Sequence, residues 1–195
     1  ILNQLVDEKR LIKNESRPVK YQLINHPLSS QIEDSIFYQL IGHDTSLSSQ
    51  VKLAKAAILY PQYSLPSLIQ GQDGVGKTTF AHYMHQFAIE NNVISNNSSI
   101  TKIDGESFNN HFTIEENFEN YRTTVTEAEE GTLLIEQLDL CPKPLLNLIM
   151  DDIDQYMRTR NLILICTTSD SLNSDIKDTL RNRFSVNITL TSLEE

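Results

Sequence analysis

Residues 71–78 read Gly71-Gln72-Asp73-Gly74-Val75-Gly76-Lys77-Thr78, and this stretch decides the fold. Its glycines let the backbone take positive φ angles, so that several N–H groups can face one anion. Lys77 supplies a charge for the β and γ phosphates of a nucleotide, and Thr78 supplies a hydroxyl for Mg²⁺. A helix beginning here adds partial positive charge at its N-terminus. The stretch therefore predicts a phosphate-binding loop for ATP or GTP.

The sequence on either side of this loop has the order that the loop requires. Residues 65–70 are mostly apolar and indicate a short buried strand. After the loop, apolar side chains recur at helical spacing at Phe80, Ala81, Met84, Phe87 and Ala88. A glycine-rich turn that contains a lysine by chance is the alternative. Strand, loop and helix in succession favour the phosphate-binding loop.

The whole chain of 195 residues is long enough for one main domain and a small appendage. From Ser35 onward, apolar strands alternate with helical patterns, which predicts an α/β fold with a mainly parallel five-stranded sheet in a three-layer P-loop NTPase sandwich. We expect strands near residues 66–70, 100–104, 132–136, 161–167 and 185–191, and helices near 47–59, 78–91, 143–157 and 172–181.

Residues 1–24 differ from the rest because basic side chains outnumber acidic ones there. They read as the end of an amphipathic helix, a strand, a turn at residues 14–18 and a second strand at 19–23. This is similar to the last third of a winged-helix DNA-binding domain, with residues 14–18 as the wing. A hairpin that serves only for packing is the alternative. We place a polar linker at residues 25–34 and the nucleotide-binding domain at residues 35–195.

Composition narrows the class of protein further. The formal net charge is −10, which argues against nucleic acid wrapping the main domain, because phosphate contacts need clustered Lys and Arg. No apolar run is long enough to cross a bilayer and no signal peptide is seen, so we expect a cytoplasmic protein without membrane contact. The chain begins and stops within a pattern, and we expect a longer parent protein.

A second strand must complete a phosphate-binding site, and residues 131–137 are the candidate. This apolar run ends in Glu136, which with Thr78 would hold Mg²⁺. Gln137 follows, where hydrolysis needs a base. An amide can orient water but cannot accept its proton, and general acid–base assistance contributes on the order of 10²–10⁴ in rate. We predict nucleotide binding with weak or absent hydrolysis; activation of water by another group is the alternative.

Residues 36–195 resemble the AAA+ ATPase domain of bacterial sigma-54-dependent transcription activators of the LevR type, whose regulation is tied to the sugar phosphotransferase system. The resemblance rests on Phe37-Tyr38-Gln39-Leu40-Ile41-Gly42-His43, on residues 54–61 and 65–66, on residues 126–134 and on residues 191–195. It implies that Ile41 and Gly42 lie near the adenine, and that Thr168 or Ser169 stands at the sensor position. It also implies that Arg181 or Arg183 reaches the nucleotide of a neighbouring subunit.

The chain departs from that family in one important respect. Such activators contact the sigma factor through a loop reading Gly-Ala-Phe-Thr-Gly-Ala, and residues 105–130 contain no such motif and are too short for the usual insertion. The segment 141–161 is compressed as well. With Gln137, this suggests a degenerate module that keeps ATP-dependent assembly or switching without the motor stroke.

The predicted nucleotide-binding residues are Ile41, Gly42, Gly71, Gln72, Asp73, Gly74, Val75, Gly76, Lys77, Thr78 and Thr79, with Thr78 and Glu136 for the metal. The predicted catalytic positions are Gln137, Ser169, Arg181 and Arg183. We interpret His82 and His85 as an ordinary, partly exposed pair and not as a metal site.

The predicted function is an ATP-binding regulatory domain of a bacterial DNA-binding transcription regulator. We expect ATP and Mg²⁺ as cofactors. The expected partners are DNA through the N-terminal part, RNA polymerase carrying sigma-54, and further copies of the chain. Two alternatives stay open: an active AAA+ ATPase that remodels another partner, and an oligomerisation module that binds no nucleotide.

Overall fold

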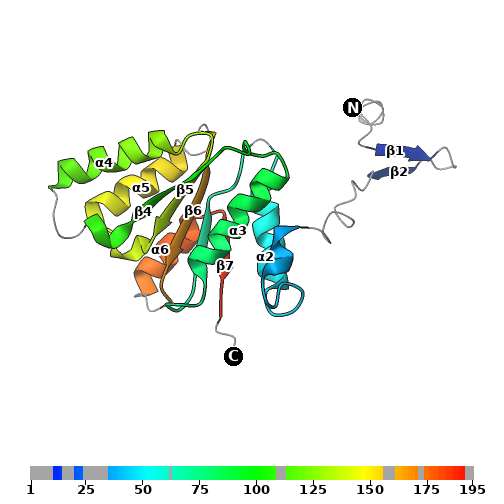
Figure 1. Ribbon diagram of the computed structural model, residues 1–195, viewed down its shortest axis with the longest axis horizontal. Helices are drawn as coiled ribbons and strands as arrows, with labels where there is room; N and C mark the ends of the chain where they lie inside the picture. Colours follow the sequence, from blue (N-terminus) through cyan, green and yellow to red (C-terminus); the bar gives the residue numbers. More distant parts are fainter. Residues whose placement is uncertain are drawn as a thin grey trace. The chain divides into compact units, whose positions relative to one another are not determined.

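The computed structural model describes residues 11–14, 20–23, 35–61, 63–108, 113–155, 161–170 and 174–191. The chain divides into two compact units, Ile1–Ser35 and Ile36–Glu195. Figure 1 labels the helices and strands of both units. Because the placement of one unit relative to the other is not determined, each is described by itself.

The described residues 11–14 and 20–23 of the first unit form an antiparallel strand pair. β1 (Leu11–Asn14) pairs with β2 (Lys20–Leu23), with Leu11 opposite Leu23 and Asn14 opposite Lys20. The predicted helix end before residue 11, the turn residues 15–18 and the linker 25–34 lie outside the described residues. The winged-helix interpretation therefore stays a prediction.

The second unit is built on the predicted five-stranded parallel sheet. Its strands are β3 (Ser67–Gln70), β4 (Ile100–Asp104), β5 (Thr132–Glu136), β6 (Ile163–Thr168) and β7 (Val186–Thr189). The order across the sheet is β4-β5-β6-β3-β7, and every neighbouring pair is parallel. All five carboxyl ends therefore meet at one edge, which is where open α/β sheets bind ligands.

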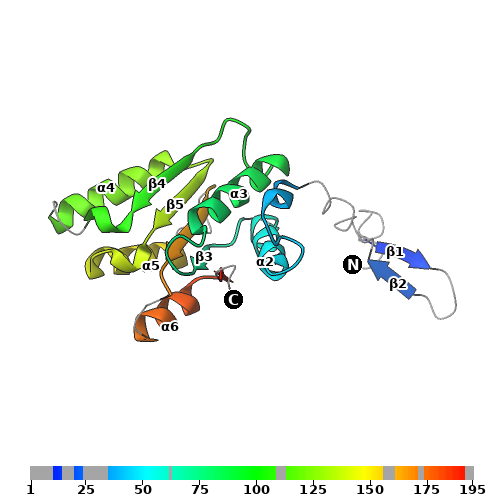
Figure 2. The ribbon, with the colours of Figure 1, turned by 60° about the horizontal axis from the view of Figure 1, so that its bottom comes forward.

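Helices cover both faces of this sheet and make three layers (Figure 2). The helices α2 (Ser48–Ile58) and α3 (Lys77–Glu90) pack on one face, and α4 (Ile114–Glu127), α5 (Lys143–Gln155) and α6 (Ser174–Arg183) pack on the other. Three short 3-10 helices, η1 (Ile36–Gln39), η2 (Gly105–Phe108) and η3 (Leu138–Leu140), lie in the connections. The predicted bounds of α2, α3, α5 and α6 differ from these by at most two residues.

Successive strand residues alternate between the two faces, and this alternation aims the site residues. On β5, Leu133 and Ile135 belong to the core formed with α4, α5 and α6, whereas Leu134 belongs to the core formed with α2 and α3. Glu136 follows Leu134 by two residues, so its side chain lies on the side of α3. The carboxylate is thus directed toward the helix that begins with the phosphate-binding loop.

The helix α4 is an element that the sequence analysis did not predict. Its Tyr121 and Val125 are almost fully buried, so the acidic stretch around them is one face of a packed helix. Its start is a capping box, in which Thr113 Oγ1 accepts from Glu116 N at 3.2 Å and Glu116 Oε2 accepts from Thr113 N at 2.8 Å. Glu116, one of the glutamates that make the helical pattern of apolar residues hard to recognise in the sequence, therefore also helps to start the helix.

Candidate nucleotide-binding site

The loop between β3 and α3 has the backbone that its glycines predict. Gly74 and Gly76 have φ angles of 81° and 97°, in the left-handed region that other residues enter at a cost. Gly71 is needed for another reason, since a Cβ there would lie 2.6 Å from the carbonyl oxygen of Leu190. The residue that follows β7 thus packs closely against the start of the loop.

The ammonium group of Lys77 is held within this loop. It donates to the carbonyl oxygens of Gly71 at 2.7 Å and Gln72 at 3.0 Å, and it contacts the Asp73 carboxylate at 3.3 Å. The Lys77 side chain is only 10% exposed, whereas that of Asp73 is 84% exposed. An acidic side chain of the loop therefore lies beside the lysine that the sequence assigns to the phosphates.

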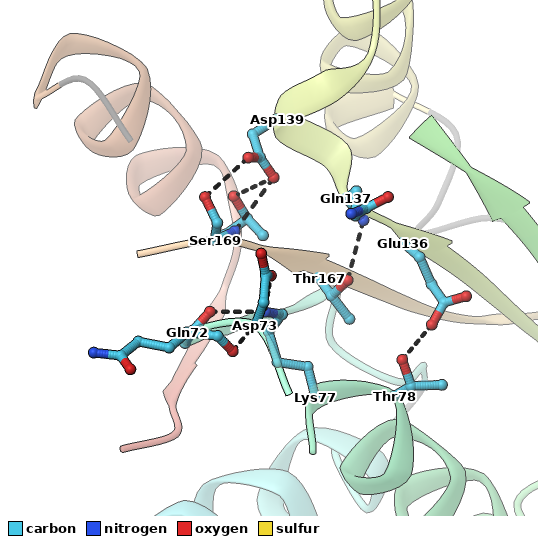
Figure 3. A network of polar contacts seen from close by, with 11 residues as sticks. Gln72, Asp73, Lys77, Thr78, Glu136, Gln137, Asp139, Thr167 and Ser169 are labelled. Atoms are coloured by element: carbon cyan, nitrogen blue, oxygen red, sulfur yellow. Dashed lines mark hydrogen bonds and ion pairs between the residues drawn. The ribbon is translucent and has the colours of Figure 1, made fainter. Parts of the chain in front are cut away.

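Thr78 and Glu136 come together from α3 and β5, as the sequence predicts for a magnesium site. The Thr78 hydroxyl donates a hydrogen bond to Glu136 Oε1, and Figure 3 shows the two side chains directed at each other. A hydroxyl and a carboxylate are oxygen ligands of the kind that Mg²⁺ takes. Among the described residues there is no cluster of three or more metal-ligating side chains. The two residues fit an ion that completes its shell with phosphate oxygens and water.

The carboxyl end of β6 is tied to the segment after β5. Gln137 is in the left-handed conformation, with φ 49°, and its N–H donates to Thr167 Oγ1 at 3.1 Å. Asp139 Oδ1 accepts from Thr168 Oγ1 at 2.8 Å and from Ser169 N at 3.3 Å, and its Oδ2 accepts from Ser169 Oγ at 3.1 Å. Figure 3 shows this group above the phosphate-binding loop. Both residues proposed for the sensor position are therefore oriented by Asp139.

Asp139 is a residue of this edge that the sequence analysis did not single out. The available signal was its place three residues after Glu136, at the end of a strand whose carboxyl end was already assigned to the site. Because the connecting segment is a 3-10 helix and not an extended loop, the chain turns back and brings Asp139 to the end of β6.

A cavity of about 760 Å³ lies beside the loop and joins it to an apolar wall. Leu40, Ile41, Leu47, Tyr83 and Leu190 line it together with Val75 of the loop. Ile41 is 78% exposed, an unusual fraction for a large apolar side chain. Gly42, the neighbour predicted to lie near the adenine, does not line the cavity. The volume of the cavity, and its division between a polar loop and an apolar wall, suit a nucleotide.

The two candidate arginines lie near the C-terminal end of α6. The Nε of Arg181 donates to Gln70 Oε1 at 3.0 Å, within the same chain. Arg183 is the last residue of α6 and is exposed. Both side chains are exposed, and that of Arg181 is tied to the end of β3 in its own chain.

His82 and His85 are not the partly exposed pair that the sequence suggested. His82 is exposed, but His85 is buried at 4% exposure and its Nδ1 lies 2.9 Å from Thr132 Oγ1. Burial, and secondly the charge of His82, lower the pKa of His85, against a backbone hydrogen bond at Ser98 that raises it. The expectation was wrong for His85 because His85 belongs to the buried stripe of α3 formed with Ala81, Met84 and Ala88, whereas His82 lies outside that stripe.

Sheet order, loop geometry and the Thr78–Glu136 pair together define a P-loop NTPase fold. The family model for "ATPase family associated with various cellular activities (AAA)" matches residues 67–192. The chain belongs to this AAA family.

Two curated proteins are similar to this chain. The transcriptional regulatory protein LevR of Bacillus subtilis (strain 168) is 25% identical over 244 aligned positions, which cover 100% of this chain and 26% of LevR. The transcriptional regulatory protein DagR of Salmonella typhimurium (strain 14028s / SGSC 2262) is 37% identical over 113 positions, which cover 46% of this chain and 12% of DagR. The chain therefore spans about a quarter of the length of LevR, and its match covers a smaller share of DagR.

Solved structures of low sequence identity share the fold. RuvB of Thermotoga maritima, as its P216G mutant, superposes with a TM-score of 0.57 at 20% identity, over 79% of this chain and 48% of RuvB. NtrX of Brucella abortus, in complex with ATP, gives a TM-score of 0.55 at 18% identity, over 80% of this chain and 39% of NtrX. None of the helices in the described ranges has the length and apolarity to span a bilayer.

Proposed function

We propose that this chain is an ATP-binding regulatory domain of a DNA-binding transcription regulator, in which bound nucleotide sets the assembly of several copies and is hydrolysed slowly. One observation carries the proposal. The phosphate-binding loop and the Thr78–Glu136 pair are complete, yet the residue after Glu136 is Gln137. The site has the groups that hold a nucleotide and lacks a carboxylate at the position of the base.

Each side chain has a distinct role in this proposal. With nucleotide bound, Lys77 would exchange its contact with Asp73 for the phosphates, and Thr78 and Glu136 would hold Mg²⁺, which would neutralise phosphate charge. Gln137 orients water but cannot take its proton, so the step that breaks the phosphate bond lacks general-base assistance. Ile41 and the other apolar residues of the cavity would contact the adenine of the nucleotide.

The regulatory part of the proposal is supported by the relatives. LevR and DagR are both named transcriptional regulatory proteins. The β1–β2 pair and the basic composition of residues 1–24 support DNA contact through the N-terminal part. We also propose a cytoplasmic location, as expected for a transcription regulator. A link to the phosphotransferase system is proposed on the resemblance to LevR-type regulators.

The proposal does not use the sigma-contacting loop of the activators. The alignment with LevR has 244 positions while this chain has 195 residues, so the alignment contains gaps opposite LevR residues. This supports a shortened module, in which any contact with sigma-54 uses another surface. Arg183, exposed at the end of α6, is the residue we propose to reach the nucleotide of a neighbouring copy.

Calorimetric titration of the intact chain with ATP and Mg²⁺ tests nucleotide binding. The wild type should release heat, the Lys77→Ala variant should release none, and Arg122→Met, which removes an exposed charge on α4, should bind like the wild type. Absence of heat in the wild type would defeat the proposal and leave the nucleotide-free oligomerisation module.

An active ATPase is the second candidate, and Asp139 is the observation that favours it. This carboxylate lies at the same edge of the sheet as Gln137 and could act as the missing proton acceptor, although three donors occupy its oxygens. Fast turnover that is lost in Asp139→Asn would support this candidate, whereas slow turnover in both proteins would reject it.

A further inference from the structure

One hydrogen bond joins the helix α6 to the strand that enters the phosphate-binding loop. Arg181 Nε donates to Gln70 Oε1 at 3.0 Å, across 111 residues of sequence. Gln70 is the last residue of β3 and directly precedes Gly71, the first residue of the loop. A side chain of α6 is thus hydrogen bonded to the residue from which the loop begins.

The main chain of Gln70 is held firmly at this point. Gln70 lies between β6 and β7, opposite Thr168 and Thr189, and its carbonyl oxygen accepts from Leu190 N at 2.8 Å. Its side chain is fully buried. A change in the side-chain partner of Gln70 therefore affects the backbone at the point where β3 ends and the loop begins.

The buried amide of Gln70 depends strongly on Arg181. Among the described residues, its Nε2 is buried without a hydrogen-bond partner, and Oε1 is the atom that accepts from Arg181. A buried polar group is costly to leave unpaired. If α6 moved away, Oε1 would lose its partner as well and both ends of the buried amide would be unpaired, so the position of α6 and the conformation of Gln70 are linked in energy.

The other end of the link is also rigid. Asn187 Nδ2 donates to the carbonyl oxygens of Arg181 at 3.1 Å and Phe184 at 3.3 Å, which fixes the end of α6 to the start of β7. Leu180 and Phe184 anchor the same turn in the core that contains Leu68 of β3. Arg181 therefore extends from a fixed helix end to a fixed strand end.

We infer that Arg181 is a positioning residue for the nucleotide site of its own chain: it braces the start of the phosphate-binding loop against α6. This inference rests on the proposed function, because it assumes that the loop binds ATP. Loop movement on binding is transmitted through Gln70 to α6, the helix that carries Arg183 two residues later. In this inference Arg181 positions the loop of its own chain, and Arg183 contacts the nucleotide of a neighbouring copy.

A double-mutant cycle on the ATP dissociation constant tests the link in the intact chain. Arg181→Met keeps the aliphatic stem and removes the donor, and Gln70→Leu keeps the volume and removes the amide. Each should weaken binding of ATP with Mg²⁺ by on the order of tenfold, because the loop start is no longer preorganised. The double variant should be no weaker than either single variant, because the two residues act through one contact.

The controls separate this link from general stability and from the proposed function. Asn182→Ala, exposed on the same helix, should bind like the wild type. Arg181→Gln, whose amide can donate to Gln70, should restore part of the affinity, and it decides the matter together with Gln70→Leu if Arg181→Met fails to fold. Wild-type affinity in Arg181→Met or Gln70→Leu, or additive losses in the double variant, would overturn the inference. Failure of the wild type to bind ATP would instead overturn the proposed function.

Discussion

The hydroxyl of Thr78, in the first turn of α3, donates a hydrogen bond to the carboxylate of Glu136 at the end of β5. The two residues are 58 apart in sequence, and the order of the strands brings them together. This pair fixes the phosphate-binding loop relative to the strand that completes the site.

Removing either partner should reduce the effect of magnesium on nucleotide binding. Thr78→Val deletes a hydroxyl at nearly constant volume, and Glu136→Gln deletes a charge, so each should lower Mg²⁺ affinity on the order of ten- to hundredfold. The measurement is the ratio of ATP affinities with Mg²⁺ and with EDTA. Thr126→Val, on the exposed side of α4, is the matched control and should keep the wild-type ratio. An unchanged ratio in Thr78→Val would place the metal elsewhere.

Asp73→Asn should strengthen ATP binding. The substitution removes a negative charge that lies 3.3 Å from the Lys77 ammonium and competes with the phosphates for it. Because Asp73 is highly exposed, the gain should be modest, about two- to fivefold at low salt, and it should shrink as salt is added. Titrations at two salt concentrations measure it, with Asp151→Asn on α5 as a control for charge alone. Weaker binding in Asp73→Asn would show that the carboxylate assists the phosphates.

The stability of the fold should fall below neutral pH because of His85. Burial lowers its pKa, so the unfolded chain takes up a proton more readily than the folded chain. The contribution to stability is fully present above about pH 6.5 and is lost as the pH falls through that value toward the folded pKa. Urea midpoints between about pH 7.5 and about pH 5.5 measure the slope. His85→Gln should flatten it, and His82→Gln should flatten it less, because the charge of His82 is only the second cause of the lowered pKa of His85. Equal slopes in the wild type and His85→Gln would refute the assignment.

Gln137→Glu should raise ATP turnover. The substitution supplies a carboxylate that can accept the proton of water, an assistance that contributes on the order of 10²–10⁴ in rate. Affinity for ATP should change little, since Gln137 belongs to the proposed hydrolytic step and not to the loop. Gln137→Met, which has similar volume without proton-accepting ability, is the control. Equal turnover in the two variants would mean that position 137 does not limit hydrolysis.

Much of the fold was predictable because the local pattern and the packed structure agree. The inner strands β3, β5 and β6 are short and buried nearly throughout, while the edge strands β4 and β7 are partly exposed. The loop carries three glycines that its backbone requires, so sequence spacing sufficed for β3 to β7 and for α3. The helix α4 was missed because its exposed glutamates outnumber its buried residues, although Thr113 followed by Glu116 was a usable capping signal. The side chains buried on its inner face, such as Tyr121, recur at helical spacing but are few.

The candidate site divides in the same way. The proximity of Thr78 and Glu136 follows from motif and strand position, so the sequence could predict it. The contacts of Asp139 with Ser169, 30 residues away, and of Arg181 with Gln70, 111 residues away, depend on how distant segments pack, so the sequence could not predict them. Burial of His85 was likewise decided by which side of α3 meets the sheet.

Steady-state ATP turnover by the intact wild-type chain, measured beside Lys77→Ala under conditions in which the wild type binds ATP, tests the central claim most directly. A switch that holds nucleotide and lacks a base at position 137 predicts wild-type turnover close to the Lys77→Ala background. Robust turnover that depends on Lys77 would contradict this account and establish an active ATPase.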